Sequence, residues 1–287
     1  MTVPGGRAQP VDTGTDTVRA EIVDGVAVLT FNRPQRRNAL HPEMYEAVPR
    51  LLEQFADSVD VGCVLVTGAG DAFCAGGDVR DGGSARAAED HVATGDPEEQ
   101  IRARTAILAD NARMVTLLHS MPKVTIAALP GAAVGAGMSI ALSTDLRIAA
   151  RSARLIPGWA KLAFSGDFGG AWLLTHLVGP SRALELLVSD APIDTASGER
   201  LGLFNRVVDD ADLPAAAVRW ATEIAAGPTA AFAGTKANIL EAECLSLQEA
   251  LVGESERMVR SALTQEHRDA VKAWLANAAK NKIGARS

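Results

Sequence analysis

The sequence predicts an α/β fold in which strands and helices alternate, followed by a region made almost entirely of helices. Apolar runs typical of buried strands occupy residues 63–67, 124–128 and 146–149, and each is followed by a turn and a helix-forming segment. From Leu213 onward nearly every residue favours a helix, with Pro228 as an interruption. The repetition predicts a core of β-β-α units with a C-terminal helical extension.

A hairpin and a helix are predicted near the N-terminus. Residues 1–15 are rich in Pro, Gly, Thr and Asp and lack the basic and apolar regions of a signal peptide, so we expect a flexible tail. Apolar residues alternate over 18–23 and 26–31 around Asp24-Gly25, a dipeptide that favours a hairpin turn. Residues 42–58 have helical periodicity and begin with a proline suited to a first turn.

Composition limits the remaining possibilities. With 287 residues, of which 47% are hydrophobic and 22% charged, the chain is large enough for one sizeable core, which we assign to residues 16–210. Residues 211–287 are expected to form an apolar helical extension that needs a surface to bury against. A net charge of −7 argues against general nucleic-acid binding. No segment approaches the ~18 apolar residues of a membrane span.

Cysteine and histidine usage predicts neither a disulfide nor a metal site. The three cysteines have no C-x-x-C spacing, which favours reduced thiols in a cytoplasmic protein. The five histidines are scattered, so we expect no metal. The cysteines are Cys63, Cys74 and Cys244.

Two small-residue turns are candidates for binding negative charge. Residues 130–145 place a Gly- and Ala-rich turn between an apolar strand and an apolar helix, where the first amides of the helix have no partner within it. In residues 71–79, another strand runs into a glycine-rich loop. Two backbone donors that face each other would form an oxyanion hole, although loop glycines also commonly serve only to turn the chain.

Four motifs in order resemble the crotonase superfamily, also called the enoyl-CoA hydratase/isomerase family. Its members have a spiral, ClpP-like core of β-β-α units. The motifs span roughly residues 16–210, and a helix-rich remainder is also typical of the family. They are Arg33-Pro34-x-x-x-Asn38-Ala39-Leu40, F-C-A-G-G-D at residues 73–78, the turn and helix at residues 130–145, and Gly169-Gly170-x-x-Leu173 with the later Val178-Gly179-x-x-x-Ala183.

The resemblance implies an acyl-CoA thioester substrate whose carbonyl is held by two backbone amides, here those of Gly77 and Ala136. Coenzyme A belongs to this substrate, so no separate cofactor is implied. The family pattern implies adenine contacts from the backbone of Ala75 and Val79. Arg36, like other arginines close to the first two motifs (Arg33, Arg37 and Arg80), is a candidate for the CoA phosphates or simply a solvated surface residue. Family members use the helical C-terminal region, here residues 211–287, to form trimers, often paired as hexamers, so the resemblance implies a homotrimer or homohexamer.

The chain departs from the family's hydratases where they carry two catalytic glutamates. Those positions are Ser139 and Trp159, neither of which can act as a base near neutral pH. Asp167 instead matches a carboxylate of family members that shift double bonds. The pattern is therefore closer to isomerase-like members, in which one carboxylate takes a proton from one carbon and returns it to another.

Each of these residues also has a structural interpretation. Asp167 precedes an apolar run and suits a helix N-cap, a role compatible with catalysis. Trp159 is either a core or intersubunit aromatic or a wall against the acyl chain, and Ser139 either bonds its own backbone or orients substrate. Phe168, with Phe164 and Trp172, is expected to line an apolar pocket that raises the pKa of Asp167.

The leading functional hypothesis is enoyl-CoA double-bond isomerisation with Asp167 as the proton shuttle. A hydratase of fatty-acid type, which is a hydro-lyase, is the first alternative, with Asp167 positioning water. A thioester hydrolase and a non-catalytic acyl-CoA binding protein are the others.

Overall fold

The computed structural model describes residues 8–78 and 96–284, with side chains through residue 276. The chain divides into two compact units, Met1–Gly227 and Pro228–Ser287. The first unit contains all the strands of the described residues and every residue singled out above as a site candidate.

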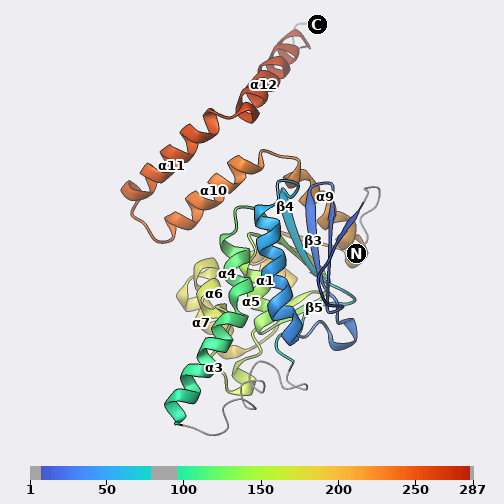
Figure 1. Ribbon diagram of the computed structural model, residues 1–287, viewed down its shortest axis with the longest axis vertical. Helices are drawn as coiled ribbons and strands as arrows, with labels where there is room; N and C mark the ends of the chain where they lie inside the picture. Colours follow the sequence, from blue (N-terminus) through green and yellow to red (C-terminus); the bar gives the residue numbers. More distant parts are fainter. Residues whose placement is uncertain (1–7, 79–95, 285–287) are drawn as a thin grey trace. The chain divides into compact units, whose positions relative to one another are not determined.

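Two sheets form the frame of the first unit (Figure 1). In the seven-stranded sheet, β1, β2 and β3 are antiparallel neighbours, whereas the strands from β3 to β11 run parallel. Its strands, in spatial order, are β1 (Gln9–Val11), β2 (Val18–Val23), β3 (Val26–Phe31), β4 (Cys63–Gly68), β6 (Val124–Leu129), β8 (Leu146–Ala150) and β11 (Arg206–Val208). The four-stranded sheet contains β10 (Ile193–Asp194), β9 (Arg154–Ile156), β7 (Ala132–Val134) and β5 (Ala72–Cys74).

Strands of the two sheets follow each other along the chain: one strand of the large sheet is followed by one strand of the small sheet and then by a helix. Strand β6 is followed by β7 and α5 (Ala136–Ser143), and β8 is followed by β9 and α6 (Gly170–Val178). Strands β4 and β5 form an equivalent pair. The predicted repetition of β-β-α units is thus confirmed, as is the hairpin, in which Asp24 and Gly25 both have positive φ.

Helices cover both faces of the large sheet. Alternate residues of β4 point in opposite directions: Val64 and Val66 join the larger core cluster, and Cys63 and Leu65 join the smaller one. The remaining helices of this unit are α1 (Pro42–Asp57), α3 (Pro97–Asn111), α4 (Arg113–Ser120), α7 (Pro180–Ser189), α8 (Thr195–Arg200) and α9 (Leu213–Ala225), with 3-10 turns η1 (Pro34–Arg36), η2 (Ala160–Leu162) and η3 (Asp210–Asp212).

Helix α9 corrects the predicted boundary at residue 211. Its buried residues include Leu213, Ala217 and Trp220, and they pack in the smaller core cluster with alternate residues of β3, β4, β6 and β8. The boundary between the compact units therefore lies after Gly227. Without α9 one face of the sheet would lose its apolar cover. A helix-forming composition alone does not reveal that a helix is needed to cover this face.

We expect Leu213→Ala to destabilise the first unit by about 2–5 kcal/mol, because the side chain is buried between α9 and the sheet. Urea unfolding followed by circular dichroism measures this loss. Leu184→Ala is the matched control, since Leu184 lies on α7 with 64% of its surface exposed, and its effect should be within about 0.5 kcal/mol. Equal effects of the two substitutions would show that α9 does not support the sheet.

The N-terminal segment also differs from the prediction, because order begins well before residue 16. Strand β1 pairs antiparallel with β2, with Gln9 opposite Ile22. The carbonyl of Thr13 accepts a hydrogen bond of 2.8 Å from Nη2 of Arg50. The expected flexible tail therefore does not extend over residues 9–15: the free edge of β2 offers backbone partners to a segment whose composition alone suggests disorder.

The second unit consists of α10 (Thr229–Ala242), α11 (Leu247–Ala262) and α12 (Gln265–Gly284). Helix α11 begins with a capping box, in which Ser246 and Glu249 bond reciprocally to each other's backbone. Large apolar side chains remain exposed here, including Leu247 (77%) and Met258 (66%). None of the helices among the described residues is both long and apolar enough to span a membrane. Assembly through this unit stays a prediction.

Candidate active site

The two glycine-rich turns lie side by side because their strands are neighbours. Strands β5 and β7 pair in parallel, with Ala72 opposite Ala132 and Cys74 opposite Ala133. The turn after β5 carries Gly77 and the turn after β7 leads into α5, whose first residue is Ala136. Parallel strands end at the same edge of a sheet, so both predicted amide donors come from one edge.

The backbones of these turns approach so closely that side chains are excluded. A Cβ on Gly137 would lie 2.3 Å from the carbonyl oxygen of Cys74, and a Cβ on Gly76 would lie 2.7 Å from that of Val134. The same Cβ on Gly76 would be 3.5 Å from the amide nitrogen of Ala136. By contrast, apart from its two chain neighbours, no atom of the described residues lies within 4 Å of the Cβ position of Gly77. Gly76 and Gly137 therefore allow the backbones of the two turns to touch, whereas Gly77 is not packed against the other turn.

Both candidate amides are available to a ligand. Ala136 follows Gly135, which has φ 54° and caps α5, so the amide of Ala136 is one of the unpaired donors at the helix start. In the part of the chain that the structure describes, neither Ala136 N–H nor Gly77 N–H has a hydrogen-bond acceptor. Two such donors, one of them at a helix N-terminus, suit an oxygen that gains negative charge during a reaction.

The Arg33–Leu40 segment supports the turn that carries Gly77 through contacts with the residues on both sides of that glycine. Arg33 forms a buried ion pair of 2.9 Å with Asp78, directly after Gly77, and donates a 2.7 Å hydrogen bond to the carbonyl of Ala39. Leu40 N–H donates to the carbonyl of Gly76 at 2.8 Å. Arg33 thus serves the turn itself, and its burial argues against the alternative role of binding CoA phosphates.

Asn38 completes this support. It is fully buried with φ 56°, accepts from the amide of Arg33 at 2.9 Å, and donates to the carbonyls of Ala69 and Ala72 at 2.9 and 2.8 Å. The two donated bonds join the first motif to the segment that leads into β5, and the bond from Arg33 closes the motif on itself. The motif is therefore structural support for the turn.

Asp167 lies close to the second turn through an unforeseen contact with Trp159. The indole Nε1–H of Trp159 donates to Oδ1 of Asp167 at 2.8 Å. A Cβ on Gly135 would lie 3.8 Å from the same Nε1, so the indole lies between the carboxylate and the turn that carries Ala136. The structure therefore brings Asp167 and Ala136 to the same region of the first unit.

The N-cap interpretation of Asp167 is wrong. Gly169 caps α6, with no side-chain hydrogen bond, and Asp167 bonds Gly170 N–H through its backbone carbonyl at 3.0 Å. Positive φ values at Gly166, Phe168 and Gly169 turn the backbone sharply around the aspartate. A left-handed phenylalanine is strained, and such strain is often found at functional sites.

Partial burial raises the pKa of the Asp167 carboxyl above its ordinary value, and the hydrogen bond from Trp159 opposes this by stabilising the ionised form. Desolvation is the larger effect. The carboxylate can therefore accept a proton more readily than an exposed aspartate, while its indole partner still supports the charge.

Ser139 and Phe168 lie in the same region, and their contact with substrate stays a prediction. Ser139 is fully buried on α5, and its hydroxyl donates to the backbone carbonyl of Asp167 at 3.3 Å. Phe168 is buried in the larger core cluster, with its ring centroid 6.3 Å from that of Tyr45. Both side chains are placed to support the loop that carries Asp167.

Two aromatic residues that were expected to line the pocket are instead exposed in the isolated chain. Phe164 is 58% exposed and Trp172 is 44% exposed. The ring of Trp172 stacks on that of His176, one helical turn farther along α6, with centroids 3.8 Å apart. Of the four predicted aromatics, only Trp159 and Phe168 are buried beside the aspartate.

Cys74 is excluded as a nucleophile. Its thiol is completely buried, and desolvation raises its pKa to about 12, which keeps it protonated at neutral pH. Within residues 8–78 and 96–284, the side chains of His, Cys, Asp and Glu form no group of three that could hold a metal ion.

The proposed contacts with coenzyme A are only partly placed. Val79 and Arg80 lie outside the described residues. The amide of Ala75 donates to the carbonyl of Arg37 at 3.0 Å, so an adenine contact at Ala75 would have to use its carbonyl oxygen. Arg36 ends the 3-10 turn η1 and is half-buried. Its contact with CoA phosphate stays a prediction.

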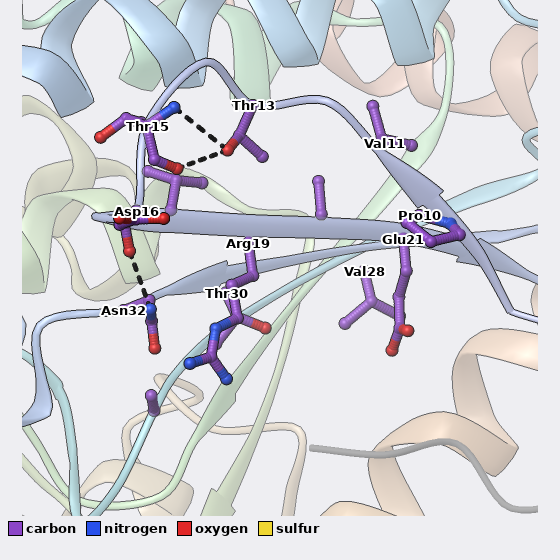
Figure 2. Close-up of a pocket in the computed structure, with 13 residues that line it drawn as sticks. Pro10, Val11, Thr13, Thr15, Asp16, Arg19, Glu21, Val28, Thr30 and Asn32 are labelled. Carbon is purple, nitrogen blue, oxygen red and sulfur yellow. Dashed lines mark hydrogen bonds between the residues drawn. The ribbon is translucent and has the colours of Figure 1, made fainter.

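A hollow of about 710 Å³ lies elsewhere, over the N-terminal strands β1 to β3 (Figure 2). Some of its polar groups bond one another: Thr13 Oγ1 donates to the carbonyl of Thr15 at 2.6 Å, and Asn32 Nδ2 donates to the carbonyl of Asp16 at 2.8 Å. None of the predicted site residues lines it. The chemistry of Asp167 and the two turns therefore does not belong to this hollow.

Comparison with known proteins gives results that agree with this geometry. Residues 21–281 match the family model described as Enoyl-CoA hydratase/isomerase. The chain is 32% identical over 259 residues to 1,2-epoxyphenylacetyl-CoA isomerase from Escherichia coli (strain K12), covering 90% of this chain and 95% of the relative. It is 38% identical over 216 residues to the Mycobacterium tuberculosis protein named Probable enoyl-CoA hydratase EchA14, covering 75% and 77% of the two chains.

A relative with a third activity is 4-chlorobenzoyl coenzyme A dehalogenase-1 from Arthrobacter sp, 28% identical over 245 residues and covering 85% of each chain. Among solved structures, an enoyl-CoA hydratase from Polaromonas sp. JS666 is similar with a TM-score of 0.81 and 30% identity, covering 91% of this chain and 97% of the other. A Thermobifida fusca YX protein in complex with acetoacetyl-CoA gives a TM-score of 0.75 and 29% identity, covering 86% and 95%.

Proposed function

Since the chain belongs to the enoyl-CoA hydratase/isomerase family and has its crotonase fold, we propose that it isomerises the double bond of an enoyl-CoA, with Asp167 as the proton shuttle. One observation carries this proposal: a single partly buried carboxylate, hydrogen-bonded to an indole, lies beside the turn that presents the amide of Ala136. The two positions where hydratases of the family would carry glutamates hold Ser139 and Trp159.

The proposed reaction needs only these groups. Asp167 removes a proton from the carbon between the thioester carbonyl and a 3,4 double bond, and the electron pair moves into a dienolate. The amides of Gly77 and Ala136 bond the enolate oxygen more strongly than the ground-state carbonyl, because it carries more charge. Protonated Asp167 then returns the proton to the fourth carbon, which leaves a 2-enoyl-CoA and the original carboxylate. No water is consumed.

Neither neighbour of Asp167 supplies a second base. The indole N–H only donates, and the Ser139 hydroxyl is occupied by the backbone carbonyl of Asp167. Water addition requires one group to activate the water and another to protonate the α-carbon. A proton shuttle uses one group twice, which agrees with the residues present.

Spectroscopy with two substrates tests the proposal. We expect 3-enoyl-CoA esters to gain the absorbance of a conjugated thioester, and 2-enoyl-CoA esters to gain no water. Loss of conjugation with a gain of one water would support the hydratase alternative, and release of a free thiol would support a hydrolase. Tight binding of CoA esters without turnover across the panel would support a non-catalytic role. Chloride release from 4-chlorobenzoyl-CoA would show that Asp167 instead supports the reaction named for the Arthrobacter dehalogenase.

The biological setting of the enzyme is part of the same proposal. We expect assembly into a homotrimer or homohexamer through the helices of the second unit, where apolar side chains are exposed. None of the three cysteines, all of which the structure describes, forms a disulfide, and we expect a cytoplasmic location. Sedimentation of the full chain tests the first expectation and fractionation of the source cells tests the second.

Trp159→Phe is expected to shift the pH dependence of isomerisation without removing the base. The substitution keeps an aromatic ring but loses the donor that stabilises ionised Asp167, so the pKa of Asp167 should rise further. Because the base acts in its ionised form, the acidic limb of the kcat/KM profile should move to higher pH. Trp220→Phe, a change on α9 far from the carboxylate in the chain, is the control. An unchanged acidic limb in Trp159→Phe would exclude this role of the indole.

A further inference from the structure

The turn that carries Trp159 is held by a buried aspartate that the proposed reaction does not itself use. Asp190 follows α7 and is only 2% exposed. Its Oδ1 accepts a hydrogen bond from the amide of Gly158, and its Oδ2 accepts one from the amide of Lys161 at 3.1 Å. The carboxylate thus bonds the backbone on both sides of Trp159.

Asp190 makes these bonds from an unfavourable conformation. Its φ is 51°, in the left-handed region that favours glycine, and a buried carboxylate is itself costly unless hydrogen-bonded. A positive charge lies close to Asp190, because Nζ of Lys161 donates a hydrogen bond to its backbone carbonyl at 3.1 Å. Bonds from backbone amides to a charged acceptor are stronger than neutral ones and offset these costs.

The opposite side of the turn is fixed by β7. A Cβ on Gly158 would lie 2.9 Å from Cγ1 of Val134, and the amide of Gly135 donates to the carbonyl of Ile156 at 2.9 Å. The turn is therefore held between the strand that leads to Ala136 and the carboxylate of Asp190. Its position determines where the indole of Trp159 meets Asp167.

We propose that Asp190 is a positioning residue that holds the Trp159 indole on the carboxylate of Asp167. The proposal rests on the proposed function, because it assigns Asp190 an effect on isomerisation through the proton shuttle. Asp190 does not touch the reacting atoms: it acts through two backbone amides, the indole and then Asp167. Removing its side chain should release the indole while both reacting groups remain in the chain.

Asp190→Gly gives the sharpest test. Glycine adopts a left-handed backbone without strain, so this change removes the carboxylate while easing the main chain. Asp24→Gly is the matched control, since Asp24 also has a left-handed φ, of 48°, but lies exposed in the hairpin turn. Asp190→Asn keeps one acceptor oxygen, so it should give an intermediate effect and serves as a second variant if Asp190→Gly does not fold.

Fluorine NMR of the full chain labelled with fluorotryptophan gives a readout independent of activity. Of the four tryptophan signals, that of Trp159 is the one missing in Trp159→Phe. In the parent chain and in Asp24→Gly this signal should titrate with Asp167, as judged by its loss of titration in Asp167→Asn. In Asp190→Gly we expect the titration to disappear and the acidic limb of the kcat/KM profile to move to higher pH, as in Trp159→Phe.

Two results would overturn the proposal: a Trp159 signal that titrates in Asp190→Gly as in the parent chain, or an unchanged acidic limb despite an altered signal. Absence of isomerisation in the parent chain would refute the proposed function instead. The NMR comparison would then still decide whether Asp190 positions the indole.

Discussion

Asp167→Asn is expected to lower enoyl-CoA isomerisation by about 10²- to 10⁴-fold, the usual contribution of a positioned acid-base group. Asparagine preserves the shape of the side chain and can still accept from the Trp159 indole, but it cannot carry the proton. Initial rates on a 3-enoyl-CoA measure the loss. Retention of full turnover would exclude Asp167 as the shuttle.

The same substitution should stabilise the fold at neutral pH. The pKa of Asp167 is raised in the folded chain, so the folded state binds the proton more tightly than the unfolded state. Its ionisation therefore reduces stability as the pH rises through and above the ordinary aspartate range. Urea unfolding should show that Asp167→Asn gains stability at neutral pH, and that the gain disappears below the unfolded pKa near 3.8.

Asp194→Asn is the control with the opposite sign. Hydrogen bonds from the backbone and side chain of Ser197 lower the pKa of Asp194, which caps helix α8. Its contribution to stability is present above the unfolded pKa and is lost as the pH falls through the folded one. The variant should therefore lose stability at neutral pH and keep its isomerase rate. A gain in both variants would point to a general effect of removing negative charge.

Gly137→Ala is expected to reduce kcat/KM by at least about 10²- to 10³-fold, the effect of losing one oxyanion donor. The new methyl group would lie 2.3 Å from the carbonyl oxygen of Cys74, so β5 and the start of α5 must move apart. That movement displaces the turn carrying Gly77 from the turn carrying Ala136. Steady-state kinetics with an accepted enoyl-CoA, together with calorimetric binding of its saturated analogue, would measure the change.

Gly77→Ala provides the comparison within the same site. Within the described ranges, only its chain neighbours approach its Cβ position within 4 Å, and its φ is not in the left-handed region, so the backbone amide should stay in place. We expect this variant to keep most of the activity that Gly137→Ala loses. If both substitutions were equally harmful, substrate contact at Gly77, and not the spacing of the two turns, would explain the losses.

Local patterns in the sequence predicted most of the core. The strands β2, β3, β4, β6 and β8 are apolar runs, and the Asp24-Gly25 turn has the chemistry that a hairpin needs. Helix α9 was assigned to the wrong unit, because its composition indicates a helix without indicating the surface it covers. Strand β1 was missed for a similar reason, since it depends on a partner strand and carries little apolar signal of its own.

The loops that form the site could be predicted from the sequence, but the hydrogen bonds between their side chains could not. Glycines at 76 and 137 marked the close backbone approach that the structure contains. The bond between Trp159 and Asp167 spans eight residues through a loop with left-handed turns, a geometry that no helical or strand period predicts. The support from Asp190 is 32 residues from Gly158 and depends on how α7 packs.

The claim that Asp167 shuttles a proton during isomerisation is tested most directly by analysing the products formed in deuterated water. The parent chain and Asp167→Asn would be incubated with 3-enoyl-CoA in deuterated water, and the products analysed by mass spectrometry. Isomerisation through Asp167 predicts a shifted double bond and no added water in the parent chain, with deuterium in the acyl chain where the proton on Asp167 exchanges before it is returned. The variant should not shift the double bond. Addition of one water by the parent chain, or undiminished isomerisation by Asp167→Asn, would contradict it.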